Sequence, residues 1–359
     1  ANLIFSPFSI AQAFSMAMAG TDGATEQQIR DALHVTLSHD TYYPALGVLN
    51  STLITSESNF PAGSGDVFQL NIANSLWAQA NYPFRQPYLD QMQADFAGQL
   101  FTVDFISVPD EVRGQINDWV EDRTEDKIQD LLPPGIITPD TRMVLANAIY
   151  FKASWNSPFE EYNTEDDTFT LLDGATLTVP MMHQQESFGY VQGAGFQAVE
   201  LPYWGGNVAM LAIVPDAGTF AQFEAGLNVQ QFDTLRHQLT YGEVQLAMPR
   251  FEFATDLNLK PPMIALGVVD AFDPALADFS RMVDLGESLF ISGALHKAYI
   301  GVDEAGTEAA AATALIMDTT AAPMPSEPVI IQLDRPFIYA IYDRATGSIL
   351  FLGRVMNPA

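Results

Sequence analysis

The spacing of apolar residues changes along the chain, and it predicts helices in the first third and mostly strands afterwards. Residues 2–10 indicate a short strand that runs into a helix. The apolar run from Ile10 to Gly20 predicts that this helix is buried on every side. Ser6 can cap it, and Pro7 suits its first turn.

Two further helices are expected from their polar starts. Thr25–Gln28 has the form of a capping box and predicts a short helix up to Leu33. Asp110 can cap a second helix, and its apolar residues recur at helical spacing as one stripe. That stripe consists of Val112, Ile116, Trp119 and Val120. Residues 41–65 are expected to mix helix and loop.

Strand patterns follow. The near-continuous apolar run from Arg142 to Phe151 predicts a central strand buried on both faces, with Asn147 alone inside it. The last two strands should form a hairpin that turns at Arg344–Gly347. Strands are expected at 67–78, 168–172, 177–182, 197–202, 208–215, 242–253, 337–342 and 349–355. Since no composition break divides the chain, we predict one α+β domain.

Charge and cysteine content limit the partners. The 359 residues include 15 basic and 44 acidic side chains, for a net charge of −29. This charge makes nucleic acids and anionic membranes poor partners. Residues 31–84 contain no Lys or Arg, so that part offers no polyanion site. The absence of Cys excludes disulfides and thiolate chemistry. Residues 1–21 are uncharged but lack the basic start of a signal peptide.

Motifs of common enzymes are missing. The sequence contains no Gly-x-Ser-x-Gly, no His-Glu-x-x-His and no phosphate-binding Gly-Lys loop. Its histidines lack metal-ligand spacing, and they are His34, His39, His183, His237 and His296. We therefore expect no enzymatic activity, no metal and no cofactor. A catalytic triad assembled only in space stays open as an alternative.

Residues 303–328 are the most unusual stretch. They begin with acids and a glycine, continue with an alanine run and end with three prolines. Since Ala is the best helix former, composition alone favours a three-turn helix at Thr307–Met317. Pro323, Pro325 and Pro328 would then form the linker after it.

Seven stretches in order along the chain resemble those of one family, the serpins. They are Asn2–Ile10, Leu145–Trp155, Val179–Met182, Leu295–Lys297, Asp303–Ala312, Leu333–Phe337 and Phe351–Pro358. The family's first helix precedes the Asn2 motif, and we expect it to be absent from this chain. The chain is expected to be a prokaryotic member.

The resemblance implies one serpin domain at 1–359, with three β-sheets and a metastable native state. In the family, a protease cleaves an exposed loop, here about 304–328. The loop then inserts as an extra strand into the large central sheet, and the acylated protease is trapped. The implied partner is a serine protease held as a covalent acyl complex. The protein would be secreted and monomeric, without a polyanion cofactor.

The same resemblance implies roles for individual residues. The hinge of the loop would be Glu304, Gly306, Thr307, Glu308, Ala309, Ala310, Ala311 and Ala312. Read as a strand, Thr307, Ala309, Ala311 and Thr313 share one face of small side chains that can enter a sheet. Ser6, Ser9, Asn147 and His296 would form a polar cluster where the sheet opens. Glu304, Arg250 and Trp155 would meet at the top of the same gap. Ordinary buried polar groups and a weak surface ion pair are the alternative interpretations.

Counting 16 residues from Glu304 places the scissile bond at Thr320–Ala321, next to Asp318 and Thr319. Residues 303–334 contain no Lys, Arg or aromatic residue, which favours elastase-like or subtilisin-like proteases. The segment after Thr320 is longer than usual for the family, so Met317, Asp318 or Met324 stays open as the bait residue. A non-inhibitory serpin that binds or carries a ligand is the alternative function, although the small residues at 309–312 disfavour it.

Overall fold

The computed structural model describes residues 1–55, 68–96, 100–284, 289–307 and 327–359. The strands are β1 Leu3–Phe5, β2 Phe68–Gln79, β3 Leu100–Val103, β4 Met143–Ser154, β5 Thr164–Thr170, β6 Thr176–Gly193, β7 Phe196–Pro202, β8 Val208–Pro215, β9 Thr240–Pro249, β10 Phe251–Asn258, β11 Gly293–Val302, β12 Gly306–Thr307, β13 Val329–Gln332, β14 Phe337–Asp343 and β15 Ile349–Val355. The helices are α1 Pro7–Met18, α2 Gly23–Ala32, α3 His39–Thr55, α4 Gln86–Phe96, α5 Pro109–Arg123, α6 Phe220–Gly226, α7 Val229–Gln238 and α8 Lys260–Ala265, with short 3-10 turns η2 Glu161–Asn163 and η3 Asp270–Phe272.

The described strands form two hydrogen-bonded sheets. One has six strands in the order β10-β11-β12-β4-β2-β3, and the other has nine. The nine-stranded sheet follows β1-β15-β14-β8-β7-β6-β9-β13, with β5 on β6. Its 18-residue strand β6 pairs with β5 and β9 along one part and with β7 at its end. Two of the three sheets expected from the sequence are therefore joined through this one strand.

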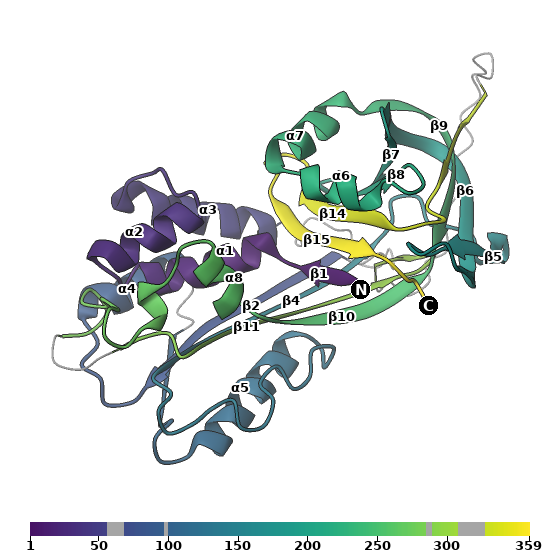
Figure 1. Cartoon of the computed structure of the whole chain (residues 1–359). Helices are drawn as coiled ribbons and strands as arrows, with labels where there is room; N and C mark the ends of the chain where they lie inside the picture. The colour runs from purple at the N-terminus through teal and green to yellow at the C-terminus, as the bar shows by residue number, and fades with distance from the viewer. Residues whose placement is uncertain (56–67, 97–99, 285–288, 308–326) are drawn as a thin grey trace.

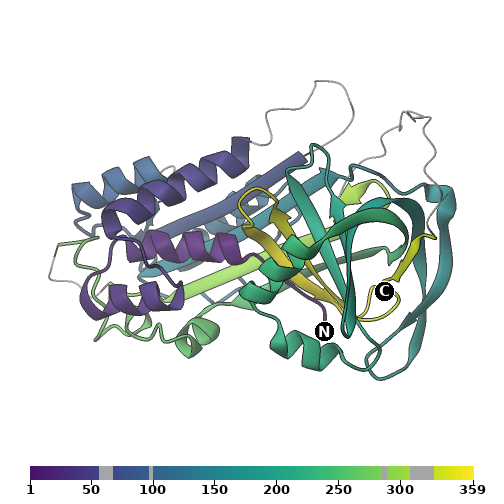
Figure 2. The same ribbon diagram turned by 90° about the horizontal axis from the view of Figure 1, so that it is seen from above.

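The six-stranded sheet lies between layers of different kinds. Helices α1–α4 gather over one end of its upper face, the nine-stranded sheet covers the other end, and α5 lies on the opposite face (Figures 1 and 2). Apolar side chains fill each interface. Phe151 and Tyr339 lie in the interface with the nine-stranded sheet, Phe14 and Tyr88 in the interface with the helices, and Ile116 in the interface with α5. The α+β fold class predicted from the spacing is confirmed.

Most predicted elements are present. Helix α1 begins at Pro7, and the Ser6 side chain accepts a hydrogen bond from the Ser9 backbone N–H. Strand β4 contains the predicted central run, and β14 and β15 form the predicted hairpin. The run predicted as one strand at 242–253 is divided into β9 and β10 after Pro249. Within the described residues, no helix is both long and apolar enough to span a membrane.

Two predicted helix caps are wrong. Helix α2 begins at Gly23, and Asp22 caps it by accepting from the Gly23 backbone N–H. Thr25 is instead buried, and its hydroxyl accepts from the Asp278 backbone N–H of a distant loop. Asp110 lies inside the first turn of α5, which starts at Pro109 without a side-chain cap. Thr25 therefore has a tertiary partner that its local pattern does not reveal, whereas Asp110 is not the cap because the helix starts one residue before it, at Pro109.

Candidate functional site

The central feature of the six-stranded sheet is the boundary between β4 and β11, which we call the seam. The two strands pair in parallel along one half, from Gly293 with Val144 to Ala298 with Ile149. Beyond this half, β12 lies between them and pairs antiparallel with both. The start of the predicted hinge thus occupies the open end of the seam.

Gly306 is required by this close packing. An added Cβ would lie 2.1 Å from the Ala153 carbonyl oxygen and 2.7 Å from the Ser154 Cα atom. Both contacts are with backbone atoms, which cannot rotate away. A side chain at position 306 would therefore push the hinge out of the seam or distort β4.

A tight turn between β11 and β12 directs the hinge into the seam. The Asp303 side chain accepts hydrogen bonds from the backbone N–H groups of Ala305, at 2.9 Å, and Gly306, at 3.1 Å. Burial raises the pKa of Asp303, an effect that these two bonds oppose. The Trp155 indole donates to the Asp303 carbonyl at 3.0 Å, and the Trp155 backbone N–H donates to the Ala305 carbonyl at 2.9 Å. Trp155 therefore holds the turn at two points.

Glu304 is anchored in the same place, with only 5% of its surface exposed. Arg250 donates to its carboxylate through Nε at 2.7 Å and also through Nη2, and the Thr164 hydroxyl donates to the same oxygen. Burial alone would raise the pKa of Glu304, but the hydrogen bonds from Arg250 and Thr164 hold it below its usual range. The structure therefore brings together Glu304, Arg250 and Trp155, as the sequence predicted, and adds Thr164.

Thr307 turns its side chain toward the nine-stranded sheet. It is buried, and its hydroxyl lies 2.8 Å from the Tyr203 hydroxyl. The Tyr203 ring stacks on Trp155 with centroids 4.5 Å apart. Sequence reasoning missed Tyr203, because a tyrosine at the end of an apolar strand carries no signal that distinguishes it from ordinary core.

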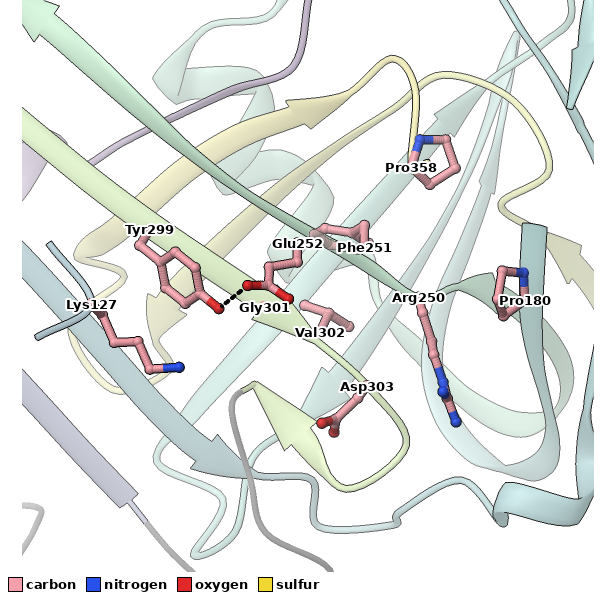
Figure 3. A pocket seen from close by; sticks show the side chains of 10 residues that line it. All are labelled: Lys127, Pro180, Arg250, Phe251, Glu252, Tyr299, Gly301, Val302, Asp303 and Pro358. Atoms are coloured by element: carbon pink, nitrogen blue, oxygen red, sulfur yellow. Dashed lines mark hydrogen bonds between the residues drawn. The ribbon is translucent and has the colours of Figure 1, made fainter. Parts of the chain in front are cut away.

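A groove of about 560 Å³ opens beside the hinge. Figure 3 shows Arg250 and Asp303 at one end of it and Lys127 at the other. Between them, the Tyr299 hydroxyl donates to Glu252 at 2.8 Å, and the Lys127 Nζ atom lies 5.3 Å from the centroid of the Tyr299 ring. The groove therefore leads from the outer face of β10 and β11 to the residues that hold the hinge.

The second predicted group lies beneath the paired half of the seam. Ser6, Ser9, Asn147 and His296 are each fully buried, and hydrogen bonds connect them. Asn147 and His296 face each other across the seam, where the Asn147 side-chain oxygen meets His296 Nδ1. We call Ser6, Ser9, Gln12, Asn74, Asn147 and His296 the polar cluster.

Two members of the polar cluster were missed in the sequence. Asn74 on β2 accepts from the Ser9 hydroxyl at 2.9 Å and from Asn147, and it donates to Gln12 at 3.0 Å. Asn74 is the residue of β2 paired with Asn147. A signal existed for Gln12: Ser6, Ser9, Gln12 and Ser15 recur at every third position along a mostly apolar helix.

His296 is held neutral. Burial lowers its pKa from 6.5 to about 3. Its Nε2 atom accepts from the Ser6 backbone N–H at 3.1 Å, so the proton of the neutral ring must be on Nδ1. The cluster can therefore exchange hydrogen-bond partners without moving a charge.

The remaining predicted residues lie outside the described part of the chain. These are the rest of the hinge, Glu308, Ala309, Ala310, Ala311 and Ala312, and the bait residues Asp318, Thr319, Thr320 and Ala321. Among the described residues, no group of three or more acidic or histidine side chains is placed to hold a metal ion.

Comparisons with known proteins agree with this geometry. The family model described as Serpin (serine protease inhibitor) matches residues 1–358. An uncharacterised serpin-like protein of Thermococcus kodakarensis is 38% identical over 99% of this chain and 81% of its own length. The leukocyte elastase inhibitor of Sus scrofa is 36% identical over 99% of this chain and 93% of its own length. Among solved structures, human thyroxine-binding globulin complexed with thyroxine has a TM-score of 0.84 and 31% identity, covering 100% of this chain and 92% of the globulin. The chain therefore belongs to the serpin family, as its motifs predicted.

Proposed function

We propose that this protein is a suicide-substrate inhibitor of serine proteases. A target protease would cleave the loop near Thr320–Ala321 and form an acyl bond with it. Insertion of the cleaved loop between β4 and β11 would then carry the protease away before the ester hydrolyses. The family supports inhibition in general, and the arrangement of the seam supports this mechanism.

One observation carries the proposal: β12 already pairs with both strands of the open seam. Gly306 pairs with Ser154, and Thr307 pairs with Ala153 on one side and Val302 on the other. These pairs fix the register of any further insertion. Because β12 is antiparallel to both neighbours, full insertion would replace one parallel pairing by two antiparallel ones, which are slightly more stable per residue.

The same register predicts which residue of the inserted loop would reach the polar cluster. Each step along the hinge moves one residue back along both β4 and β11, so position 313 would lie between Asn147 and His296. Thr313, which lies outside the described residues, has the same strand parity as Thr307 and would present its hydroxyl to the polar cluster. A hydrogen-bonding side chain would thus arrive where insertion separates Asn147 from His296.

The bait sequence supports proteases with shallow pockets. Residues 303–334 contain no Lys, Arg or aromatic side chain. The specificity pockets of trypsin-like and chymotrypsin-like proteases would therefore have no side chain to bind. Small residues flank Thr320–Ala321, which suits elastase-like and subtilisin-like enzymes. The relative named leukocyte elastase inhibitor points the same way.

The test uses pancreatic elastase, subtilisin and trypsin with the full chain. We expect a complex stable in SDS with elastase or subtilisin, and mass spectrometry should place the cleavage at Thr320–Ala321. Ala311→Glu puts a charge on the face that would be buried, whereas Ala310→Glu puts it on the opposite face. The first variant should be cleaved without forming a complex, and the second should retain most complex formation. Cleavage of the unmodified chain by every protease without a complex would refute the proposal.

A binding or carrier function is the second candidate, and two observations favour it. The chain resembles thyroxine-binding globulin, and it has an apolar cavity of about 410 Å³ between β1, β15 and α7. Val229, Phe232, Ile338 and Leu352 contribute to the cavity wall. Measuring the melting temperature before and after loop cleavage separates the candidates. A large rise indicates insertion, whereas no rise together with saturable thyroxine binding would favour the carrier.

A further inference from the structure

We infer that Gln12 is a positioning residue for opening of the seam, because it is the terminal acceptor of a directed hydrogen-bond chain that crosses from β11 to α1. The effect of Gln12 on loop insertion rests on the proposed function, although the hydrogen-bond chain itself can be tested without a protease. Gln12 lies in α1, is only 4% exposed, and accepts from the Asn74 amide at 3.0 Å.

The direction of the chain is fixed at its first bond. A backbone N–H can only donate, so the Ser6 N–H makes His296 Nε2 an acceptor. The ring proton is then on Nδ1, which donates to the Asn147 side-chain oxygen. The tautomer of His296 thus decides which end of the Asn147 amide faces β11.

Each following bond is then determined. Because its oxygen faces His296, Asn147 presents its NH₂ group to the Ser9 hydroxyl, at 2.7 Å, and to the Asn74 oxygen. Asn74 must therefore turn its own NH₂ group away from β4, toward α1. There the Gln12 oxygen receives it. An acceptor at position 12 therefore gives the Asn74 N–H that points toward α1 its partner.

Loss of this acceptor would affect the seam through Asn74. Without a partner for its NH₂ group, Asn74 is left with a buried unpaired donor, and only the bonds that its oxygen accepts from the Ser9 hydroxyl and from Asn147 still orient its amide. The acceptor that orients Asn147 toward His296 is then itself less firmly held. The acceptor at Gln12 therefore maintains contacts across the seam that it does not itself touch.

Helix α1 and its cap Ser6 connect the two sides of the seam. Ser6 binds β11 through His296, whereas Ser9 and Gln12 bind β4 and β2 through Asn147 and Asn74. One end of the helix is thus attached to one side of the seam, and its middle is attached to the other. Weakening the bond at Gln12 loosens the attachment to β2 and β4, and we expect the seam to part more readily.

The experiment compares Gln12→Leu, which removes the acceptor, with Gln12→Glu, which keeps an acceptor oxygen. Gln28→Leu is the matched control, since the Gln28 oxygen accepts from the Val269 and Asp270 backbone N–H groups far from the seam. The first readout is the ¹⁵N chemical shifts of His296, which report both its tautomer and the hydrogen bond that its Nδ1 atom makes to Asn147. The second is amide exchange of residues 144–149 and 293–298 in the uncleaved protein.

Gln12→Leu should change the His296 shifts and speed exchange across the seam about tenfold, the effect of losing one net hydrogen bond of roughly 1.4 kcal/mol. Gln12→Glu should restore both values to near those of the unmodified chain. Unchanged His296 shifts in Gln12→Leu, or equal acceleration in Gln28→Leu, would overturn the inference. Because neither readout uses a protease, failure of the covalent complex would count against the proposed function alone.

Discussion

Two pairs of neighbouring strands, one near the middle of each sheet, are both deeply buried but differ in construction. Strands β8 and β14 pair antiparallel over six residue pairs, and every residue of β8 is buried and apolar. Strands β4 and β11 also pair over six residue pairs, but in parallel, with Asn147 facing His296 in the middle. Parting β8 from β14 would expose apolar surface and strand hydrogen bonds together. Parting β4 from β11 would separate Asn147 from His296, and an inserted polar side chain can replace the hydrogen bond that they lose.

The difference teaches where a sheet can accept a strand. Buried polar side chains stabilise a sheet only while they are hydrogen-bonded, and a new hydrogen-bonding partner can replace the original one. We call such contacts replaceable. Apolar packing offers no such exchange. The β4–β11 seam combines replaceable contacts with a hinge already between its ends, and the β8–β14 pair has neither.

The largest expected effect is at the apolar pair. Ile213→Asn in β8 should lower the free energy of unfolding by about 4 kcal/mol, because it removes buried apolar surface and leaves an amide unpaired. Urea unfolding of the uncleaved and the loop-cleaved protein should show the same loss. A loss confined to the uncleaved protein would mean that this pair also opens, which would break the comparison.

The next effect is at the entrance to the seam. Gly306→Leu should raise the ratio of cleaved to complexed product roughly tenfold to 100-fold, since overpacking against β4 costs about 1–3 kcal/mol. Gels of elastase reactions measure this ratio. The control is Gly114→Leu in α5, where an added Cβ meets nothing within 4 Å. Equal effects of the two substitutions would show that the entrance has no special role.

A third effect follows from His296. Its folded-state pKa of about 3 lies below the unfolded value of 6.5, so its neutral form stabilises the fold fully above pH 6.5 and progressively less as the pH falls toward 3. Between pH 6.5 and 5.5 the free energy of unfolding should fall by roughly 1 kcal/mol. His296→Gln should lose this part of the pH dependence. An unchanged profile in His296→Gln would contradict a polar cluster held in its neutral form.

The smallest effect concerns the hinge contact. Tyr203→Phe removes the hydroxyl next to Thr307 and should speed amide exchange of Thr307 about fivefold, as expected for about 1 kcal/mol. The control is Tyr88→Phe, which removes a buried hydroxyl that donates to the Met16 carbonyl of α1. Faster exchange in the control would indicate general loosening and would leave Tyr203 without a specific role.

The sequence predicted the elements that carry this site better than the contacts within it. Strands and the buried helix follow from apolar spacing, because burial of one or both faces is imposed on every residue of an element. Ser6, Ser9, Asn147 and His296 could be grouped because the family motifs contain them. Their geometry could not be derived from spacing, since they come from one helix and two strands that are far apart in the chain.

What the sequence did not reveal were partners chosen by tertiary packing. Thr164 and Asn74 lie in strands, and Tyr203 directly after one, whose patterns are ordinary. Only tertiary packing places them against Glu304, Asn147 and Thr307. Thr25 shows the reverse error. Its local sequence predicts a helix cap, but its hydroxyl accepts a hydrogen bond from the Asp278 backbone N–H of a distant loop. Polar residues in predicted strands are therefore best assigned after pairing is known.

The position of β14 has a consequence for synthesis of the chain on the ribosome. This strand lies between β8 and β15, yet β8 ends at Pro215 and β14 begins only at Phe337. At about 5–20 residues per second, translation leaves the apolar edge of β8 without its neighbour for roughly ten seconds. During that interval the nascent chain carries an open β-edge of the kind that aggregates. Strand β14 is thus translated long after the strand whose edge it covers, and chaperones have a defined edge to protect until then.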